Sequence, residues 1–547
     1  MGFLKLGLLM FSILLVAFPQ QREQELQSRI EGLVLKATNA EPLAGAVVVL
    51  RREGSGPYDR QYTTTTTGDG RFTLKDIPKA RYMLSASKAG FMTQEYGQKQ
   101  ANKVGVILDL TAPQVMRDIV VRMNMGGSIS GRVYEQDGTP IESTMIVAFQ
   151  KKYQRNGKSV LSQANVVATN DIGEYRMYWL PPGTYYLLAV VVRTRAPLDP
   201  IAIIDQSEES LEAFSPVFYP RGDDESQASA LRIEPGSELR AIDFVVVRTK
   251  ALRVKGHVIS ASSGRPLVGA ILHLRLQYVE KLGRDYWWSA ETDSEGNFQF
   301  RNVPPGKYIL RVSWTESGSL TMSTQRDLEL ADKEVPEFHI VLQANSIDGR
   351  VIMERGEPVL QNRTVLLFVE GDGTALGTGL QPDGTFSLPY ASTGRLYLEL
   401  TGLADNFFLR SARVGNKDVS REGLSLDERG ADSLEVVIGS EGATVAGIVT
   451  DDHQTPVMGA RVVLMPDGEH RDRPDLVKAV TTDRSGQFAI RGAMPGNYKI
   501  FCWDDLEPNI YFDPSFIQQY ESQGKALHLN ANDSITVNLR PISVRAN

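Results

Sequence analysis

The sequence contains a single cysteine, Cys502, among its 547 residues. One cysteine cannot form an intramolecular disulfide, and it excludes a zinc or iron–sulfur site built from cysteines. The excess of charge of one sign is also small: the sequence has 59 Lys and Arg and 66 Asp and Glu, for a net charge of −7. This balance, with no basic block, argues against a nucleic-acid partner.

The local signatures of catalysis are absent too. The sequence has no GxxxxGK[ST] phosphate loop, no GxGxxG between a strand and a helix, and no GxSxG nucleophile elbow. None of the six histidines has a glutamate three residues later, which a His-x-x-Glu zinc peptidase site requires. We therefore predict a protein that is not an enzyme and that holds no metal and no cofactor. The histidines are His257, His273, His339, His453, His470 and His528.

The N-terminus has the pattern of a secretory signal peptide over residues 1–18. Lys5 precedes a mostly apolar run from Leu6 to Phe18, and a polar stretch follows. This run is shorter than the roughly 20 residues of a membrane-spanning helix, and no second long apolar run occurs. We expect the mature chain to have no membrane span and to be secreted, periplasmic or at the cell surface. An uncleaved N-terminal anchor is the alternative.

Five copies of one pattern fill the rest of the chain. Each copy opens on a short apolar strand with a central glycine, and 35 to 42 residues later a turn glycine is followed by an aromatic two positions on. A tyrosine comes twelve or thirteen residues after the turn glycine. The opening glycines are Gly32, Gly131, Gly256, Gly349 and Gly447, and the aromatics are Phe72, Tyr175, Phe298, Phe386 and Phe488.

This pattern predicts an all-β fold. Short alternating strands separated by Pro, Gly and Asp turns, with almost no helical periodicity, are typical of antiparallel β-sandwiches. We predict a tandem array of about five such modules, prealbumin-like or immunoglobulin-like. Because few residues connect one module to the next, we expect an elongated rod. The predicted boundaries are 29–124, 125–249, 250–344, 345–440 and 441–547.

The second module carries an insertion at about residues 193–224. The interval from Tyr185 to Gly256 is 71 residues, whereas the same interval is 49 in the first copy, 41 in the third and 50 in the fourth. A short helix is predicted around residues 207–214. Insertions on a rigid scaffold often hold a binding function. A loop that covers a sheet edge is the alternative.

The repeated motifs resemble the carboxypeptidase regulatory-like domain. The resemblance is strongest in the third copy, GHVISASSGRPLVGA followed by TDSEGNFQFRNVPPGKYIL, and in the fifth. It is weakest in the fourth, where LPYASTGRLYL departs from the PPGxY signature. The resemblance implies a transthyretin-like or starch-binding-like sandwich in a multi-module secreted bacterial protein. In that family the module accompanies a catalytic domain and carries no catalysis itself.

Three successive aromatics, Tyr286, Trp287 and Trp288, are the candidate ligand contact. Successive side chains of a strand point to opposite faces, so at least one of the two tryptophans should lie outside the core and could stack on a sugar ring. Core packing or a contact between modules is the alternative for these residues. The other tryptophans, and the cysteine beside one of them, are expected in cores: Trp179, Trp314, Trp503 and Cys502.

These observations lead to two hypotheses. The first is a secreted, non-enzymatic binding or surface-spacer protein that contacts a polysaccharide or an extracellular protein. The second is an accessory or regulatory array for a separate extracellular hydrolase or outer-membrane transporter, without sugar binding of its own.

Overall fold

A computed structural model of the chain shows a β protein, with 56% of its residues in strands and 6% in helices. The predicted fold class, a tandem array of β-sandwich modules, is confirmed. In the part of the chain described here, no helix combines the length and apolar character needed to cross a bilayer. The predicted signal peptide lies outside the described residues. These are 27–544 without 55–58, 100–104, 192–200, 204–209, 278–284, 316–320, 332–334, 344–345, 355–363, 370–374, 390–394, 402–404, 426–432 and 472.

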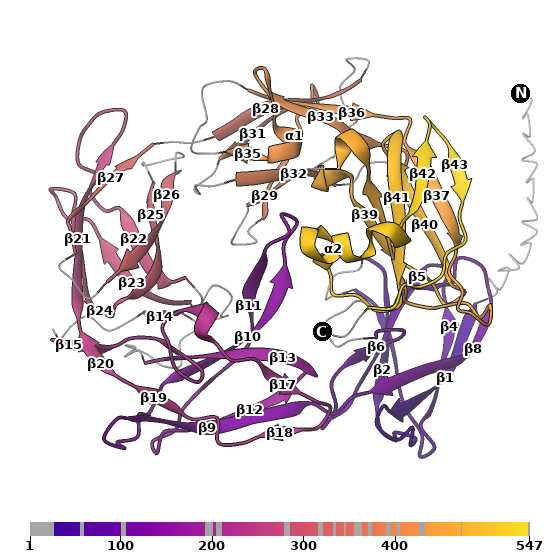
Figure 1. Ribbon diagram of the computed structural model, residues 1–547, viewed down its shortest axis with the longest axis horizontal. Helices are drawn as coiled ribbons and strands as arrows, with labels where there is room; N and C mark the ends of the chain where they lie inside the picture. Colours follow the sequence, from indigo (N-terminus) through magenta and orange to yellow (C-terminus); the bar gives the residue numbers. More distant parts are fainter. Residues whose placement is uncertain are drawn as a thin grey trace, which may run out of the picture.

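All five modules, numbered in chain order, share one strand arrangement (Figure 1). In one sheet the opening strand is central: it pairs antiparallel with the strand that follows the turn and parallel with a closing strand. In the other sheet the second long strand pairs antiparallel with both of its neighbours. Each module therefore buries apolar side chains between two sheets.

Modules 1 and 2 form the N-terminal half. Module 1 has the sheets β4-β1-β8 and β3-β2-β5-β6, and module 2 has β12-β9-β18 and β11-β10-β13-β16. The strands of module 1 are β1 (Ser28–Lys36), β2 (Val47–Arg52), β3 (Gln61–Thr65), β4 (Arg71–Ile77), β5 (Arg81–Ser87), β6 (Gln94–Glu95), β7 (Leu108–Asp109) and β8 (Val115–Met123). The elements of module 2 are β9 (Gly127–Glu135), β10 (Met145–Tyr153), β11 (Ser159–Ala168), β12 (Glu174–Leu180), β13 (Gly183–Val190), β16 (Val217–Phe218), η1 (Glu225–Gln227), β17 (Leu231–Ile233), β18 (Glu238–Leu239) and β19 (Phe244–Val246).

Module 3 follows a two-stranded sheet of β15 (Glu212–Phe214) and β20 (Arg248–Lys250). Its sheets are β24-β21-β27 and β14-β23-β22-β25-β26. Their strands are β14 (Ile201–Ile203), β21 (Leu252–Ser260), β22 (Ile271–Leu276), β23 (Asp285–Glu291), β24 (Asn297–Val303), β25 (Gly306–Thr315), β26 (Thr321–Leu330) and β27 (Phe338–Leu342).

Modules 4 and 5 complete the chain. Module 4 has the sheets β31-β28-β36-β33-β34 and β30-β29-β32-β35, and module 5 has β40-β37-β43 and β39-β38-β41-β42. The elements of module 4 are β28 (Ser346–Met353), β29 (Thr364–Val369), β30 (Ala375–Gly379), β31 (Thr385–Pro389), β32 (Arg395–Thr401), β33 (Phe408–Val414), β34 (Lys417–Asp418), α1 (Val419–Glu422), β35 (Leu424–Ser425) and β36 (Leu434–Gly439). The elements of module 5 are β37 (Ala443–Ile448), β38 (Arg461–Pro466), η2 (Gly468–His470), η3 (Pro474–Leu476), β39 (Lys478–Thr481), β40 (Gln487–Ala493), β41 (Gly496–Trp503), η4 (Ile510–Phe512), α2 (Pro514–Tyr520), η5 (Glu521–Gln523), β42 (Lys525–Leu529) and β43 (Ser534–Thr536).

The opening glycine and the repeat aromatic lie directly opposite each other in every module. Gly32 pairs with Phe72 in module 1, and the other four modules repeat this pairing. A β-carbon at Gly32 would overlap both the Phe72 ring and the carbonyl oxygen of Ile119 on the closing strand. Glycine at this position therefore lets the aromatic ring fold across the central strand.

Two polar contacts recur with the same spacing. A buried threonine four residues before the turn glycine bonds the segment that leads into the second long strand: the Thr66 hydroxyl donates to the Leu43 carbonyl and accepts from the Ala46 amide. Thr169, Thr292 and Thr482 repeat both bonds.

The repeat tyrosine makes the second recurring contact, in modules 1, 2 and 3. The hydroxyl groups of Tyr82, Tyr185 and Tyr308 each donate to the carbonyl of a proline four residues earlier.

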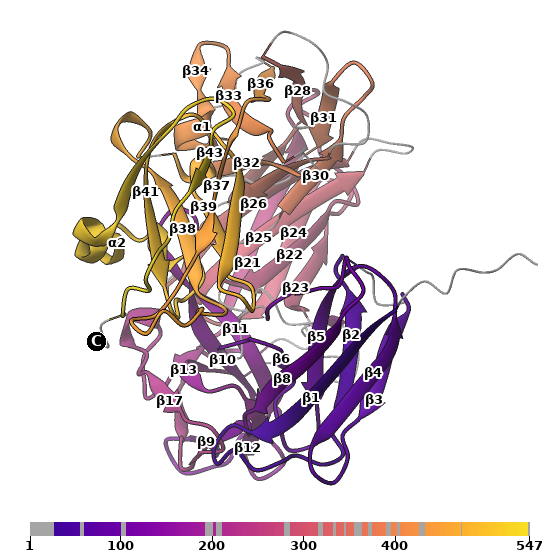
Figure 2. The same cartoon turned by 90° about the vertical axis from the view of Figure 1, so that its right-hand side faces the viewer.

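The modules form a ring, so the expectation of a rod is wrong. Figures 1 and 2 show module 5 beside module 1, at the two ends of the chain. Lys99 of module 1 pairs with the carboxylate of Asp504 and donates to its carbonyl oxygen at 2.9 Å, while Met458 of module 5 packs on the core of module 1. The hairpin of β10 and β11 also reaches module 5, where Asn509 donates to the Tyr153 carbonyl at 3.3 Å. Contacts between modules that are not consecutive in the chain thus hold the two ends together.

Neighbouring modules share buried contacts as well. Phe149 and Leu188 on the outer face of module 2 belong to one continuous hydrophobic cluster with the core of module 3. Between modules 4 and 5, the guanidinium of Arg473 is 4% exposed; it pairs with Asp475 and donates to the carbonyl of Arg410 at 3.3 Å. Such contacts restrict the relative motion of the modules.

The insertion of module 2 covers a sheet edge. Its strand β14 pairs in parallel with β23 and extends a sheet of module 3, and β15 pairs with β20. The helix predicted at residues 207–214 is wrong for 210–214, because Glu212–Phe214 is a strand; residues 207–209 lie outside the described part. Of the two alternatives for this insertion, the described residues fit the edge cover.

We expect Gly157→Val to separate the β10–β11 hairpin from module 5. Gly157 has a φ of 80° at the tip of the β10–β11 hairpin, and a β-carbon there would crowd the Phe512 carbonyl of module 5. Gly138→Val is the matched control, because Gly138 has a φ of 89° with nothing within 4 Å of its β-carbon position. Both changes add about 1–3 kcal/mol of backbone strain. Only Gly157→Val should increase the radius of gyration in small-angle X-ray scattering, and equal radii would contradict the contact.

Candidate functional site

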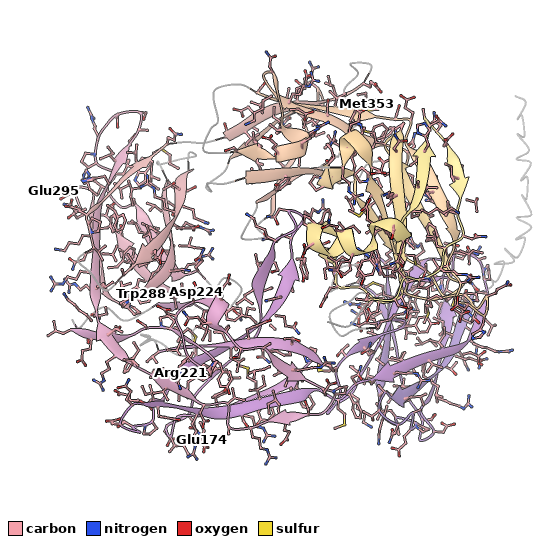
Figure 3. All side chains as sticks on the ribbon, viewed as in Figure 1. Glu174, Arg221, Asp224, Trp288, Glu295 and Met353 are labelled. Carbon is pink, nitrogen blue, oxygen red and sulfur yellow. The ribbon has the colours of Figure 1, made fainter. Side chains whose placement is uncertain are left out.

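Trp288 is a core residue, so its prediction as a sugar-stacking side chain is wrong. It is 1% exposed and makes an edge-to-face contact with Tyr308 at 5.6 Å between ring centroids; Figure 3 labels it within module 3. The alternation of β23 directs it into the sandwich. The side chains of Tyr286 and Trp287 lie outside the described part of the chain, so their role stays a prediction.

The other tryptophans divide between core and surface. Trp503 is buried and Trp314 is half-buried, with its indole N–H donating to the Val268 carbonyl at 2.9 Å. Cys502 is 2% exposed, and burial raises the pKa of its thiol to about 12, so it is not a nucleophile at neutral pH. Trp179, expected in a core, is instead 54% exposed.

A β-bulge explains the exposure of Trp179. The register between β12 and β9 shifts between Met177 and Leu180, so Tyr178 and Trp179 both stay outside the sandwich while Met177 and Leu180 point inward. Tyr178 is 52% exposed. Two adjacent aromatic side chains therefore lie on the surface of module 2. The sequence pattern missed them because strict alternation breaks at a bulge.

Polar side chains border this aromatic pair. The Arg176 guanidinium lies 4.9 Å from the centroid of the Tyr178 ring and donates to Glu238 of β18 at 2.8 Å. Arg240 donates to the same carboxylate at 3.0 Å. These ion pairs lower the pKa of Glu238 and keep it charged. We call Arg176, Tyr178, Trp179 and Glu238 the aromatic surface.

A cavity of about 450 Å³ lies between modules 2 and 3. Lys307 of β25 crosses it to Asp224 beside η1 at 2.5 Å, and Asp223 and Glu329 also line it. The hydrogen bond from Lys307 holds the pKa of Asp224 well below its usual value. The cavity thus has one ion pair and two further carboxylates.

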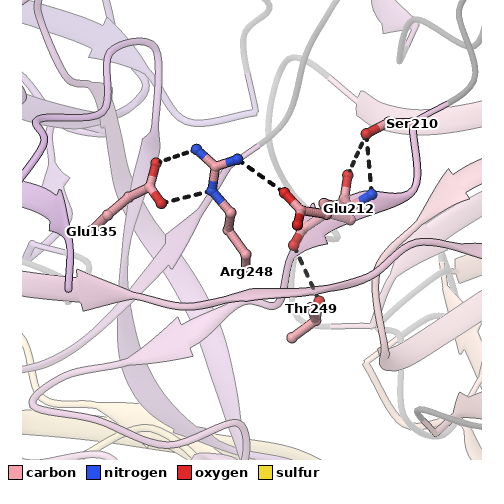
Figure 4. Close-up of polar contacts among 6 residues, drawn as sticks. Glu135, Ser210, Glu212, Arg248 and Thr249 are labelled. Carbon is pink, nitrogen blue, oxygen red and sulfur yellow. Dashed lines mark hydrogen bonds and ion pairs between the residues drawn. The ribbon is translucent and has the colours of Figure 1, made fainter. Parts of the chain in front are cut away.

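A second ion cluster fixes the connection between these modules (Figure 4). Arg248 of β20 donates two hydrogen bonds, at 2.7 and 2.8 Å, to Glu135 at the end of β9 and a third, at 2.9 Å, to Glu212 of β15. The pKa of Glu135 is lowered because Arg248 donates to it. This cluster links the insertion to the scaffold of module 2.

No metal site emerges from the described residues, since no three His, Cys, Asp or Glu side chains among them gather closely enough to hold an ion. His257 instead bonds the Glu295 carbonyl at 2.7 Å, and His528 bonds Asn497 at 2.8 Å. These imidazoles take part in local turn and strand contacts.

The fold and these surfaces define a multi-module β-sandwich protein. A family model described as the carboxypeptidase regulatory-like domain matches residues 29–112 and 253–343. The chain therefore contains two carboxypeptidase regulatory-like domains, in modules 1 and 3.

Similarity to individual proteins is more distant. Serine-aspartate repeat-containing protein D of Staphylococcus aureus strain Newman is 23% identical over 227 residues, which are 37% of this chain and 17% of that protein. The chain thus spans about a sixth of the length of this relative. Among solved structures, the minor pilin GBS52 of Streptococcus agalactiae matches 40% of this chain and 97% of its own, with 16% identity and a TM-score of 0.22. The Bacillus anthracis TIE protein matches 76% and 73%, with 13% identity and a TM-score of 0.16.

We expect Trp288→Ala to lower the free energy of unfolding by about 3–5 kcal/mol, because it removes a large core side chain. Urea denaturation followed by circular dichroism measures this loss. Val341→Ala is the matched control in the same module, since Val341 is 47% exposed and should change stability by less than about 0.5 kcal/mol. Equal effects of the two substitutions would contradict the core position of Trp288.

The Asp224–Lys307 ion pair should make the contact between modules 2 and 3 sensitive to acid. Since the folded pKa of Asp224 is lowered, its stabilisation is complete above the unfolded pKa of about 4 and is lost as the pH falls below it. The effect should stay under about 1 kcal/mol, because both side chains are a third exposed.

Urea denaturation at pH 7 and pH 3 checks this ion pair. The wild type should lose more stability between these two values than Asp224→Asn, which has no carboxylate to protonate. Parallel losses in the two proteins would show that the pair contributes nothing.

Proposed function

We propose that the chain is an extracytoplasmic, non-enzymatic binding protein whose five modules act as one rigid scaffold. The observation that carries this proposal is the packing between modules. The fused core of modules 2 and 3, the buried Arg473 between modules 4 and 5, and the contact of Lys99 with Asp504 close the ring. A scaffold of this kind holds its outward-facing side chains in fixed positions.

The ring favours the binding role over the spacer role. A spacer needs its ends far apart, whereas here modules 1 and 5 are in contact. Preorganised side chains on a rigid scaffold lose less entropy on binding than side chains on flexible loops.

An extracytoplasmic location is supported by two observations. The first 18 residues have the pattern of a secretory signal. Serine-aspartate repeat-containing protein D, which is 23% identical to this chain over 227 residues, is a bacterial surface protein, and we extend that location to this chain. A non-enzymatic role is supported by the regulatory-like module, which does not itself carry catalysis in the family it resembles.

Fractionation of bacteria that express the full chain, and binding to a panel of polysaccharides and matrix proteins, test this function. We expect the chain in the culture supernatant, the cell-surface fraction or the periplasmic fraction, and not in the cytoplasmic fraction. The purified chain should bind at least one polymer of the panel saturably and leave it chemically unchanged. A cytoplasmic chain, or cleavage of a panel member, would contradict the proposal.

A further inference from the structure

We propose that the aromatic surface of module 2 is a saccharide-binding site, in which Trp179 and Tyr178 stack on the apolar face of a pyranose ring. This inference rests on the proposed binding function and names its ligand class and its residues. Four features of the site support it: its exposure, its backbone, its counterparts in the other modules and its polar border.

The site is exposed on the outside of the ring. Its sheet, β12-β9-β18, lies at the outer edge of the molecule in Figure 1, and Glu174 of the same strand marks this edge in Figure 3. Trp179 and Tyr178 are each more than half exposed to solvent. A long polymer could therefore approach the site without displacing a module.

The backbone at Trp179 is strained. Its φ of 57° lies in the left-handed region, which a bulky side chain rarely adopts. Such conformations cost about 1–3 kcal/mol and occur where the surrounding structure imposes them, often at functional sites. Because the side chain is half exposed, packing within module 2 gives little compensation for this cost.

The same bulge in three other modules carries residues suited to it. The counterparts of Trp179 are Asp76, Asn302 and Gly492, with φ values of 57°, 59° and 65°. Asp, Asn and Gly tolerate this conformation, and each is preceded by Lys or Arg where module 2 has Tyr178. Module 2 alone among these four thus places two aromatics at the bulge.

Contact between modules does not account for the tryptophan. The counterpart Asn302 accepts a hydrogen bond from the Ser210 amide at 2.9 Å, and Gly492 faces backbone carbonyls of module 4. At Trp179 the close approach is made by backbone, because its Cα lies next to Gly126 at the junction with module 1. The indole is not required for that approach and stays exposed.

The polar border fits a sugar. A pyranose presents an apolar C–H face and a rim of hydroxyl groups. The two rings supply an apolar platform, while Arg176 and Glu238, 2.8 Å apart, offer charged donors and acceptors beside it. A protein partner would need an apolar interface core of several hundred square ångströms, and these charges interrupt the surface close to the rings.

Binding of the full chain to immobilised cellohexaose, chitohexaose, xylohexaose and maltohexaose tests the site. We expect retention on at least one of these probes. Trp179→Asn, which copies the residue of module 3, should weaken that binding at least tenfold, and Tyr178→Ala should also weaken it. Ile172→Ala is the matched control, since it removes a 52% exposed apolar side chain of the same module and should leave affinity within twofold.

Thermal unfolding separates a binding role from a structural one. Trp179→Asn removes strain, so its melting midpoint should stay equal to the wild type or rise by about 2–4 °C. A clear fall in the midpoint would overturn the inference, because it would show that the tryptophan stabilises the junction.

The remaining outcomes are equally decisive. Unchanged glycan binding in Trp179→Asn would overturn this site and leave the proposed binding function intact. Binding to a matrix protein alone, lost in Trp179→Asn, would overturn the saccharide assignment and again support a binding scaffold. If the wild type binds neither the glycans nor the matrix proteins, both proposals fail.

Discussion

The contact between a glycine and an aromatic ring across the central strand determines the architecture of every module. Gly32 and Phe72, and their four counterparts, are paired residues on adjacent strands. In modules 1, 3, 4 and 5 the phenylalanine ring lies against the position that a β-carbon would fill, and in module 2 a backbone carbonyl of the closing segment lies there. A shift of one residue would place the aromatic on the wrong face of the sheet. The pair therefore fixes the register of the two strands.

The repeats made the fold class predictable from sequence. Glycines, turn residues and aromatics act over a few residues or across one strand pair, so their spacing carries the local structure directly. The buried threonine of the turn was visible in the sequence at four residues before the turn glycine, but only its hydrogen bonds explain it. Module 4 has Leu380 at this position, in agreement with its weaker resemblance.

The ring and the exposed tryptophan were not predictable in the same way. Lys99 and Asp504 are separated by 405 positions and lie on loops without a periodic pattern. Strand alternation predicts that Trp287 and Trp288 point to opposite faces, but it does not say which of them is buried, so the burial of Trp288 could not be predicted. Trp179 was wrongly predicted in a core, because the bulge between Met177 and Leu180 adds one residue and breaks the alternation of the strand. Alignment of Trp179 with Asp76, Asn302 and Gly492 is the signal that could have revealed it.

Because modules 1 and 5 are in contact, the chain of modules is closed on itself. Any two modules are joined by two routes, one along the covalent chain and one through the noncovalent closure. A single proteolytic nick in an intermodule linker would therefore leave both fragments associated. Separation would require a second break, so resistance to extracellular proteases follows from topology as well as from the stability of each sandwich.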